Sequence, residues 1–273
     1  MHRTLVIGAG SQISHYLRES LSERGKNYLV ITSRSFDDNL SILKEEWNDV
    51  YLAFGESRKS GINHDEYNLV NYDLTKKYID ILRFTSKKIV CFSTCELWGN
   101  YTGPVDTGLI WDYKRNPYTD SKKKISEYIL GLNLNHIMIS YPFNFNSPLR
   151  TNDFLFGKIF KSIIEKKRIE LGSTNFKRDI VHPRFLTHRI LEMKNHEVIG
   201  SGRLTNVRNF IDDIYRRFGM NSQEWITETI TQNSHEKITE YYANTVKTQS
   251  YESLLDETIQ DLKNYRSQKW DKF

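Results

Sequence analysis

Short, nearly continuous apolar runs alternate with segments of helical periodicity through the first half of this chain, and this pattern constrains its fold most. The runs predicted as strands are Leu5–Ile7, Tyr28–Ile31, Val50–Phe54, Lys88–Ser93 and His136–Ser140. Helices are predicted after the first run, ending near Gly25, and over 66–84 and 121–132. Strands that are apolar on both faces and separated by helices indicate a parallel sheet covered on both sides. We therefore predict an α/β fold with a doubly wound parallel sheet.

The alternation loosens after Pro148. A helix is expected over 154–168, and 220–273 is polar, helix-rich and poor in strands. We therefore predict a first domain over 1–146, to which 178–218 returns in part, and a small, mostly helical substrate-binding lobe over 147–273.

Composition narrows the classes of function. The 273 residues are 38% hydrophobic and 27% charged, which is typical of a soluble globular protein. A net charge of +5 suits a small anionic ligand, but nucleic-acid binding usually needs a denser basic patch. No stretch approaches the roughly 20 apolar residues of a membrane span. We expect a cytoplasmic protein that binds neither nucleic acid nor membrane.

A metal site or a disulfide framework is not expected. Cys91 and Cys95 lie four positions apart without metal-ligand spacing around them. His182 and His188 are six apart, which is poor spacing for two ligands on one helix.

A glycine turn joins the first strand to the first helix, in the sequence Gly8-Ala9-Gly10-Ser11-Gln12-Ile13-Ser14. Glycines let a backbone approach a pyrophosphate, and the helix N-terminus favours its negative charge. The turn predicts a Rossmann-type dinucleotide site. Ser11 and Ser14 stand where glycine is common, and many such turns are only connections.

The second strand is followed by Thr32-Ser33-Arg34-Ser35, without the acidic residue that usually accepts the ribose 2′-hydroxyl of NAD. Arg34 lies 26 positions after Gly8, where a cation can hold a 2′-phosphate. This favours NADP(H), with NAD(H) left possible. The alternative is that Arg34 is an ordinary solvated loop residue.

Tyr118 and Lys122 stand at i and i+4, so on a helix their side chains share a face. An ammonium beside a phenol stabilises the phenolate, which lets tyrosine act as a general acid or base. Without further context this spacing is an ordinary helical turn. Thr94, however, follows the fourth strand 24 residues earlier and offers a hydroxyl for the same substrate oxygen.

Together these segments resemble the extended short-chain dehydrogenases/reductases, the NAD(P)-dependent nucleotide-sugar epimerase/dehydratase/reductase family. Its Pro-Tyr-x-x-Ser-Lys motif is similar to Pro117–Lys122, and its Ser-Ser/Thr-x-x-Val-Tyr-Gly segment to Ser93–Gly99. Other segments match in order: Asp49–Ala53, Val70–Thr75, Tyr141–Pro148 and Lys177–His182. The chain departs from the family pattern at Ser14 and Tyr141, and beyond Gly219 little is similar.

The resemblance implies a set of site residues. Thr94, Tyr118 and Lys122 would form the catalytic triad. The cofactor would contact the last two of these and also Gly8, Gly10, Ser11, Gln12, Ile13, Ser33, Arg34, Ala53, Phe54, Gly55 and Asn71. Asn144, Arg178 and His182 would bind a nucleotide-sugar. Relatives commonly pair through the helices that carry the tyrosine and lysine, so a homodimer is expected.

The motifs are compatible with more than one reaction. The leading hypothesis is NADPH-dependent reduction of a nucleotide-linked 4-keto-6-deoxy sugar at C4. An epimerase is an alternative, as is a 4,6-dehydratase with Glu96 as its base, because Thr94-Cys95-Glu96 resembles the dehydratase Thr-Asp-Glu run. A third reading, of another class, is a non-catalytic sensor of NADP(H).

Overall fold

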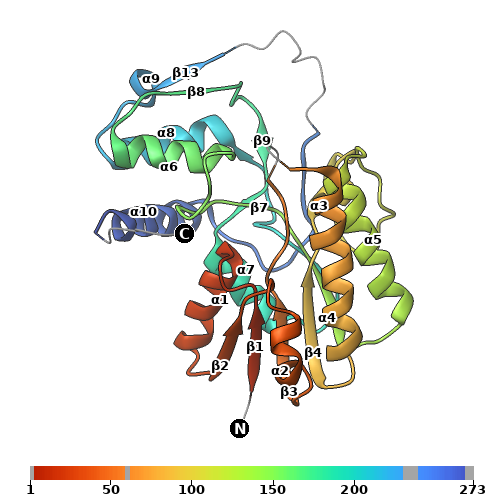
Figure 1. The fold of residues 1–273 in the computed structure, drawn as a ribbon. Coiled ribbons are helices and arrows are strands. Elements are labelled where there is room, and N and C mark those ends of the chain that lie inside the picture. Colours follow the sequence, from red (N-terminus) through yellow and green to blue (C-terminus); the bar gives the residue numbers. More distant parts are fainter. Residues whose placement is uncertain (1–2, 59–61, 230–238, 268–273) are drawn as a thin grey trace. The chain divides into compact units, whose positions relative to one another are not determined.

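The computed structural model describes residues 3–58, 62–229 and 239–267 (Figure 1). They form two compact units, the first from 1–99, 107–142 and 184–199, the second from 100–106, 143–183 and 200–273. The sequence prediction placed the first boundary at 146, whereas here the chain leaves the first unit after Pro142. The segment that returns to this unit is 184–199, shorter than the 178–218 expected.

The first unit is built on a six-stranded sheet in the order β11-β6-β4-β3-β1-β2, in which every neighbouring pair is parallel. The strands are β1 Thr4–Ile7, β2 Tyr28–Ile31, β3 Trp47–Leu52, β4 Ser86–Phe92, β6 Ile137–Pro142 and β11 Glu197–Ile199. The predicted fold class is confirmed. Strand order reverses beside β1, since the chain runs from β1 to β2 on one side and then to β3 on the other. In such sheets, ligands bind beyond the carboxyl ends of the strands at this reversal.

Two groups of helices flank the sheet (Figure 1). One group is α1 Gln12–Glu23 and α7 Pro183–Glu192, joined by a 2.8 Å hydrogen bond between the Ser20 and Thr187 hydroxyls. The other packs α3 His64–Asn68, the π-helical η2 Leu69–Leu74 and α4 Thr75–Leu82 against α5 Pro117–Leu132. Three short elements complete the unit: η1 Asp37–Asn39, α2 Leu40–Leu43 and η3 Cys95–Trp98.

Local chemistry explains where two predicted helices differ from the structure. The helix expected over 121–132 begins earlier, at Pro117, because Asn116 forms a capping box with Thr119 and proline suits the first helical position. The helix expected over 154–168 is α6 Leu155–Glu165, which ends where Lys166 adopts the left-handed conformation (φ 52°).

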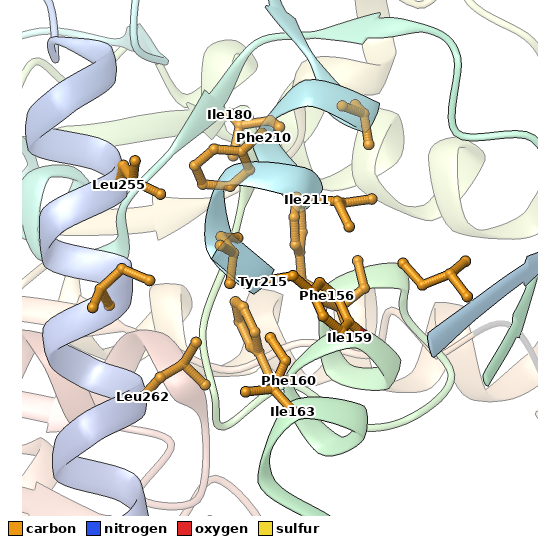
Figure 2. Packing of buried hydrophobic residues seen from close by; sticks show 14 of the residues in the cluster. Phe156, Ile159, Phe160, Ile163, Ile180, Phe210, Ile211, Tyr215, Leu255 and Leu262 are labelled. Carbon is orange, nitrogen blue, oxygen red and sulfur yellow. The ribbon is translucent and has the colours of Figure 1, made fainter. Parts of the chain in front are cut away.

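The second unit has its own apolar core, formed by α6, α8 Val207–Arg217 and α10 Tyr251–Ser267 (Figure 2). Phe160 and Phe210 are buried in it, and Leu262 contributes from α10. The short helix α9 is Ser222–Trp225. Four two-stranded ladders accompany these helices: β7 Asn144–Phe145 with β10 Ile180–Val181, β9 Lys177–Arg178 with β12 Thr205–Asn206, β8 Ile169–Leu171 with β13 Ile226–Glu228, and β5 Gly103–Val105 with β14 Tyr241–Ala243. Strands of two or three residues are too short to show alternation, so the sequence did not predict them.

Three further findings concern the described residues alone. No described helix is both long and apolar enough to span a membrane. The described part of the chain contains no group of three or more histidine, cysteine or carboxylate side chains arranged to hold a metal ion. Cys91 and Cys95 are both buried, and they are not joined in a disulfide.

Candidate active site

A cavity of about 450 Å³ lies at the carboxyl ends of β1, β2 and β3, where the strand order reverses. All of its lining residues belong to the first unit. They come from the glycine turn, the ends of β2 and β3, and η2: Gly8, Ala9, Gly10, Ser11, Thr32, Ser33, Arg34, Phe54, Gly55, Glu56, Val70 and Leu74. Of the predicted cofactor residues, the lining contains Gly8, Gly10, Ser11, Ser33, Arg34, Phe54 and Gly55.

The two glycines of the turn do different things. Gly8 has φ 116°, and a Cβ built on it would lie 2.4 Å from the Ala53 carbonyl oxygen, so the turn passes against the end of β3. A Cβ on Gly10 would meet nothing within 4 Å and would point into open space. Gly8 is therefore required by the packing of the turn. Gly10 leaves room for a ligand.

Ser11 shows what a serine does at a position where glycine is common. Its hydroxyl caps α1 by accepting a 3.0 Å hydrogen bond from the Ser14 amide, and it also donates to the Ala53 carbonyl oxygen. The serine therefore anchors the helix N-terminus to β3.

Gln12 and Ile13 are not part of the cavity lining, but Gln12 has an unusual environment. Its Oε1 is buried and has no hydrogen-bond partner among the described residues. Gln12 is the first residue of α1 and directly follows Ser11, which lines the cavity. A buried acceptor without a donor costs free energy, so this atom favours a donor supplied by a ligand or by water.

Asn71 couples the cavity wall to helix α5. Its Oδ1 accepts a 2.8 Å hydrogen bond from the Glu56 amide, and its Nδ2 donates to the Glu56 carbonyl and the Ser121 hydroxyl, both at 3.0 Å. Ser121 in turn donates to the Tyr118 carbonyl at 2.7 Å. Asn71 thus positions both the cavity wall and the helix turn that carries Tyr118. Its direct contact with a cofactor stays a prediction.

Lys122 is a buried ammonium beside the cavity. Its Nζ donates a 2.8 Å hydrogen bond to the Phe92 carbonyl, and the side chain is 6% exposed. Burial lowers the pKa of Lys122 to about 8. A Cβ on Gly55 would lie 3.1 Å from this Nζ, so a side chain at 55 would crowd the ammonium. Because Gly55 lines the cavity, its bare backbone lets the ammonium lie close behind the wall.

Helix α5 and the short helix η3 position the remaining predicted catalytic residues, Tyr118, Thr94 and Glu96. Tyr118 is partly buried at the second residue of α5, and its ring centroid lies 6.2 Å from that of Tyr67. Thr94 is buried after β4 and caps η3, where its Oγ1 accepts a 3.2 Å hydrogen bond from the Glu96 amide. The Glu96 side chain is partly buried. Their contacts with a substrate remain predictions.

Ser93, by contrast, is occupied by internal packing. Its hydroxyl donates to the Lys122 carbonyl at 3.4 Å and accepts from the Ser126 hydroxyl at 2.9 Å. The hydroxyls of Ser93 and Thr94, which both follow β4, therefore differ in their contacts, because only the Ser93 hydroxyl joins this segment to α5. This leaves Thr94 as the better candidate for a substrate contact.

Glu56 lines the cavity and was missed by the sequence prediction. Its carboxylate forms a 2.7 Å ion pair with Arg58, and the Tyr67 hydroxyl donates to the Arg58 carbonyl. Although burial opposes the shift, the hydrogen bonds and charge of Arg58 lower the pKa of Glu56. Its place directly after a predicted strand and glycine was the available signal, since such positions reach the carboxyl edge of a parallel sheet.

We expect Lys122→Met to stabilise the protein at pH 7 by about 2 kcal/mol. A lysine pKa depressed from 10.5 to about 8 corresponds to a penalty of about 3 kcal/mol, and the lost hydrogen bond to Phe92 offsets about 1 kcal/mol of that gain. The unfolded chain binds more protons between pH 8 and 10.5, so wild-type stability rises with pH there and the gain shrinks. Urea denaturation at pH 7 and pH 9.5 measures both effects.

Lys123→Met is the matched control for this experiment. Lys123 is the neighbouring residue on α5, is partly exposed and pairs with Glu127 at 3.2 Å. Its substitution should leave stability within about 0.5 kcal/mol. A Lys122→Met variant less stable than wild type at pH 7 would contradict the buried-charge account.

The predicted substrate residues lie in the second unit. Asn144 is exposed on β7, opposite Ile180. The Arg178 Nη1 donates to the Thr239 carbonyl at 2.6 Å. His182 is 1% exposed, with its Nδ1 2.8 Å from the Glu257 carboxylate and its Nε2 3.1 Å from that of Asp261. His182 therefore forms a buried ionic group with α10, and substrate contacts by all three residues stay predictions.

His182→Gln should lower the free energy of unfolding by about 3 kcal/mol at pH 6. The partly buried Glu257 and the buried Asp261 would then lack the imidazolium that pairs with both carboxylates. Burial lowers the His182 pKa, but the bonds to Asp261 and Glu257 outweigh it, and the pKa lies above its ordinary value of 6.5. The stabilisation is therefore fully present below pH 6.5 and is lost as pH rises through the folded-state pKa. Denaturant titrations from pH 6 to pH 9 should show the difference from wild type narrowing.

His188→Gln is the control, since His188 is exposed and pairs with Glu23 at the surface. It should change stability by less than about 0.5 kcal/mol at every pH. A constant difference between wild type and His182→Gln across this range would show that no proton is linked to the group.

Comparisons with known proteins find similarity in structure only. No family model matches the chain, and no curated protein matches its sequence. RMD from Pseudomonas aeruginosa, complexed with NADPH, is 15% identical over 97% of this chain and 100% of its own, with a TM-score of 0.78. UDP-glucose 4-epimerase from Thermotoga maritima, with UDP-glucose, is 14% identical over 96% of this chain and 99% of its own, with a TM-score of 0.79.

A third similar structure is TunA, an NAD-dependent NDP-hexosamine 5,6-dehydratase involved in tunicamycin biosynthesis. It is 19% identical, covers 100% of both chains and has a TM-score of 0.79. At these identities the likeness establishes the fold. The fold is the one that the motif resemblance implied.

Proposed function

We propose that this chain is an NAD(P)-dependent oxidoreductase acting on a nucleotide-linked sugar, and that it reduces a 4-keto-6-deoxy sugar at C4 with NADPH. One observation carries the proposal. The buried Lys122 ammonium lies behind Gly55 in the wall of the glycine-turn cavity, on the helix that also carries Tyr118. Burying an ammonium beside a cavity costs free energy, and a site that uses its charge for proton transfer gives that burial a function.

The residues of the cavity fit a dinucleotide. Gly10 leaves open space beside the N-terminus of α1, which suits a pyrophosphate. The Arg34 guanidinium forms no hydrogen bond or ion pair with the described residues, so it is available for a 2′-phosphate. Ser11 and Ser33 line the same cavity. The same lining admits NAD(H), since Arg34 is exposed and does not obstruct the cavity.

When bound, the nicotinamide supplies the hydride, and this chain's own residues handle the proton and the oxygen. Lys122 stays largely protonated at neutral pH and stabilises the phenolate form of Tyr118, one helical turn away. Tyr118 donates its proton to the carbonyl oxygen of the sugar as that oxygen gains charge. Thr94 donates a hydrogen bond to the same oxygen and orients it.

The structural comparisons support a sugar-nucleotide substrate. An epimerase bound to UDP-glucose and a dehydratase of an NDP-hexosamine share this fold along nearly the whole chain, as does RMD with NADPH. Asn144, Arg178 and His182 are proposed to bind the substrate. His182, which is buried, would act by fixing the backbone near Arg178.

An epimerase or a dehydratase is the second candidate, and Glu96 favours it. This carboxylate is only partly buried and follows Thr94 directly, at the start of η3. A base at that position can remove a proton from C5 of a 4-keto sugar. A sensor that binds NADP(H) without turnover is the third candidate, although it would have no use for Lys122, Tyr118 and Thr94 together.

Single-turnover absorbance at the nicotinamide band tests the proposal. The substrates are dTDP- and UDP-linked 4-keto-6-deoxyhexoses for the reductase, and the parent dTDP- and UDP-hexoses, which still carry the C6 hydroxyl, for a dehydratase. The reductase consumes one equivalent of NADPH per sugar. Epimerisation of either kind of substrate without net consumption would instead establish an epimerase, and loss of water from a parent hexose would establish a dehydratase. Binding of NADPH without any turnover would establish a sensor. Glu96→Gln separates the remaining cases, because it should leave reduction within about threefold and abolish dehydration.

The proposal includes a cytoplasmic homodimer. Leu69 is 60% exposed and Leu130 44% exposed on the helices that flank one face of the sheet, and a partner copy would cover such side chains. Light scattering of the purified chain measures the oligomeric state. A monomer at micromolar concentration would remove the dimer from the proposal without affecting the chemistry.

A further inference from the structure

The segment that follows β2 holds Arg34 between two anchored carbonyl groups. The Tyr78 hydroxyl donates a 3.1 Å hydrogen bond to the Ser33 carbonyl. On the other side, the Asn39 amide and side chain donate to the Ser35 carbonyl at 3.2 Å and 2.5 Å. The Arg34 amide itself donates to the Thr32 hydroxyl at 3.4 Å. The backbone is therefore fixed before and after Arg34, while its side chain stays exposed at the cavity.

Tyr78 makes this anchor from inside the unit. It lies on α4 one turn after Leu74, which lines the cavity, and it is fully buried. Its ring packs edge-on against Phe36, with centroids 4.9 Å apart, and against Phe54 at 5.4 Å. Burial raises the pKa of Tyr78 to about 12, so its hydroxyl stays protonated and remains a donor. The Tyr78 hydroxyl thus joins helix α4 to the segment after β2 that carries Arg34.

A fixed backbone lowers the entropic cost of binding an anion through a long cationic side chain. The arginine side chain loses rotational freedom about several bonds when it binds a phosphate. Any conformational freedom of the backbone segment that carries it adds to that entropic cost. Holding Ser33 and Ser35 removes the backbone part of this cost before a ligand arrives. The effect is largest for a ligand that contacts the guanidinium, because Arg34 has the longest side chain in the anchored part of the lining.

We infer that Tyr78 is a positioning residue for dinucleotide specificity, acting through the Ser33 carbonyl to present the Arg34 guanidinium to a 2′-phosphate. The inference rests on the proposed function, since it concerns which dinucleotide the cavity prefers. Tyr78 is fully buried and is not among the residues that line the cavity, so it acts through Ser33. Its contribution lies in the difference between NADPH and NADH rather than in binding as such.

Fluorescence titration of the full chain with NADPH and with NADH tests this assignment. Wild type should bind NADPH more tightly. Arg34→Ala should lower that preference about tenfold or more, by loss of a charge-assisted contact. Tyr78→Phe keeps the packed ring and should lower the preference about three- to tenfold, by weakening NADPH binding alone. Tyr28→Phe is the matched control, because the Tyr28 hydroxyl meets Ser22 at the opposite end of β2, and it should leave both Kd values unchanged.

Asn39→Ala provides a second variant that does not disturb the buried core. It removes the side-chain bond to the Ser35 carbonyl and should also lower the preference, by less than Tyr78→Phe because the Asn39 amide still holds that carbonyl. Equal weakening of NADPH and NADH in Tyr78→Phe would overturn the assignment, as would an unchanged preference or a wild type that favours NADH. A wild type that binds neither dinucleotide would overturn the proposed function instead.

Discussion

Replacing Tyr118 by phenylalanine should lower kcat by about 10²- to 10⁴-fold, because the variant keeps the ring but has no proton to donate. The hydroxyl is the only atom removed, so the packing of the ring beside Tyr67 and the capped start of α5 should persist. The Kd for NADPH should change by less than about threefold, since the cavity lining does not include this side chain. Steady-state kinetics with a 4-keto sugar nucleotide and fluorescence titration of the cofactor give both numbers.

Tyr128→Phe is the matched control for Tyr118→Phe. Tyr128 lies on the same helix, and its hydroxyl donates to Asp80. Its loss should leave kcat within about twofold and change stability only slightly. If Tyr118→Phe retained more than about a tenth of wild-type kcat, proton transfer would have to come from another group, and the role given to Tyr118 would be wrong.

Gly8→Ala should be the most destabilising small substitution in the first unit. The added Cβ would lie 2.4 Å from the Ala53 carbonyl oxygen and 2.8 Å from its carbon, and the backbone at φ 116° is unfavourable for any L-residue. Backbone atoms that directly follow a central strand cannot move aside without a large cost in free energy. We expect a loss of about 3 kcal/mol or more in the free energy of unfolding, measured by urea denaturation, together with loss of dinucleotide binding.

Gly10→Ala separates folding from binding within the same turn. No atom lies within 4 Å of the position of its added methyl group, so stability should stay within about 0.5 kcal/mol of wild type. The methyl would enter the space proposed for the pyrophosphate, and the Kd for NADPH should rise about tenfold or more. Wild-type affinity in Gly10→Ala would place the pyrophosphate elsewhere, and wild-type stability in Gly8→Ala would contradict the geometry of the turn.

The sheet and its helices were predictable because their signals are local. An apolar run such as Val50–Phe54 shows a buried strand, and the spacing of Ile13, Leu17 and Leu21 shows a helix. The glycine turn between them indicated the edge of the sheet where a dinucleotide would bind, and the structure has a cavity there. The ladders of the second unit were not predictable, since pairing of two residues with two others depends on segments distant in sequence.

The site itself was predicted only in part. Spacing alone placed Tyr118 and Lys122 on one helix face, and a single position after β2 identified Arg34 as a cavity cation. Glu56 and Tyr78 were missed, because their roles arise from contacts with Arg58 and Ser33 that no local pattern shows. His182 was named as a substrate residue, but its ion pairs could not be predicted, because Glu257 and Asp261 come from a helix about 75 positions later.

The sequence by itself therefore determined which residues lie on which strand ends and helix faces, because periodicity and turn chemistry act between near neighbours. Only the tertiary structure decided which of those residues are buried, which are anchored and which are left free. Burial gives Lys122 its pKa of about 8, and a carbonyl of β4 and a glycine of another loop provide its surroundings. Desolvation depends on everything packed around a group, and that packing exists only once the chain has folded.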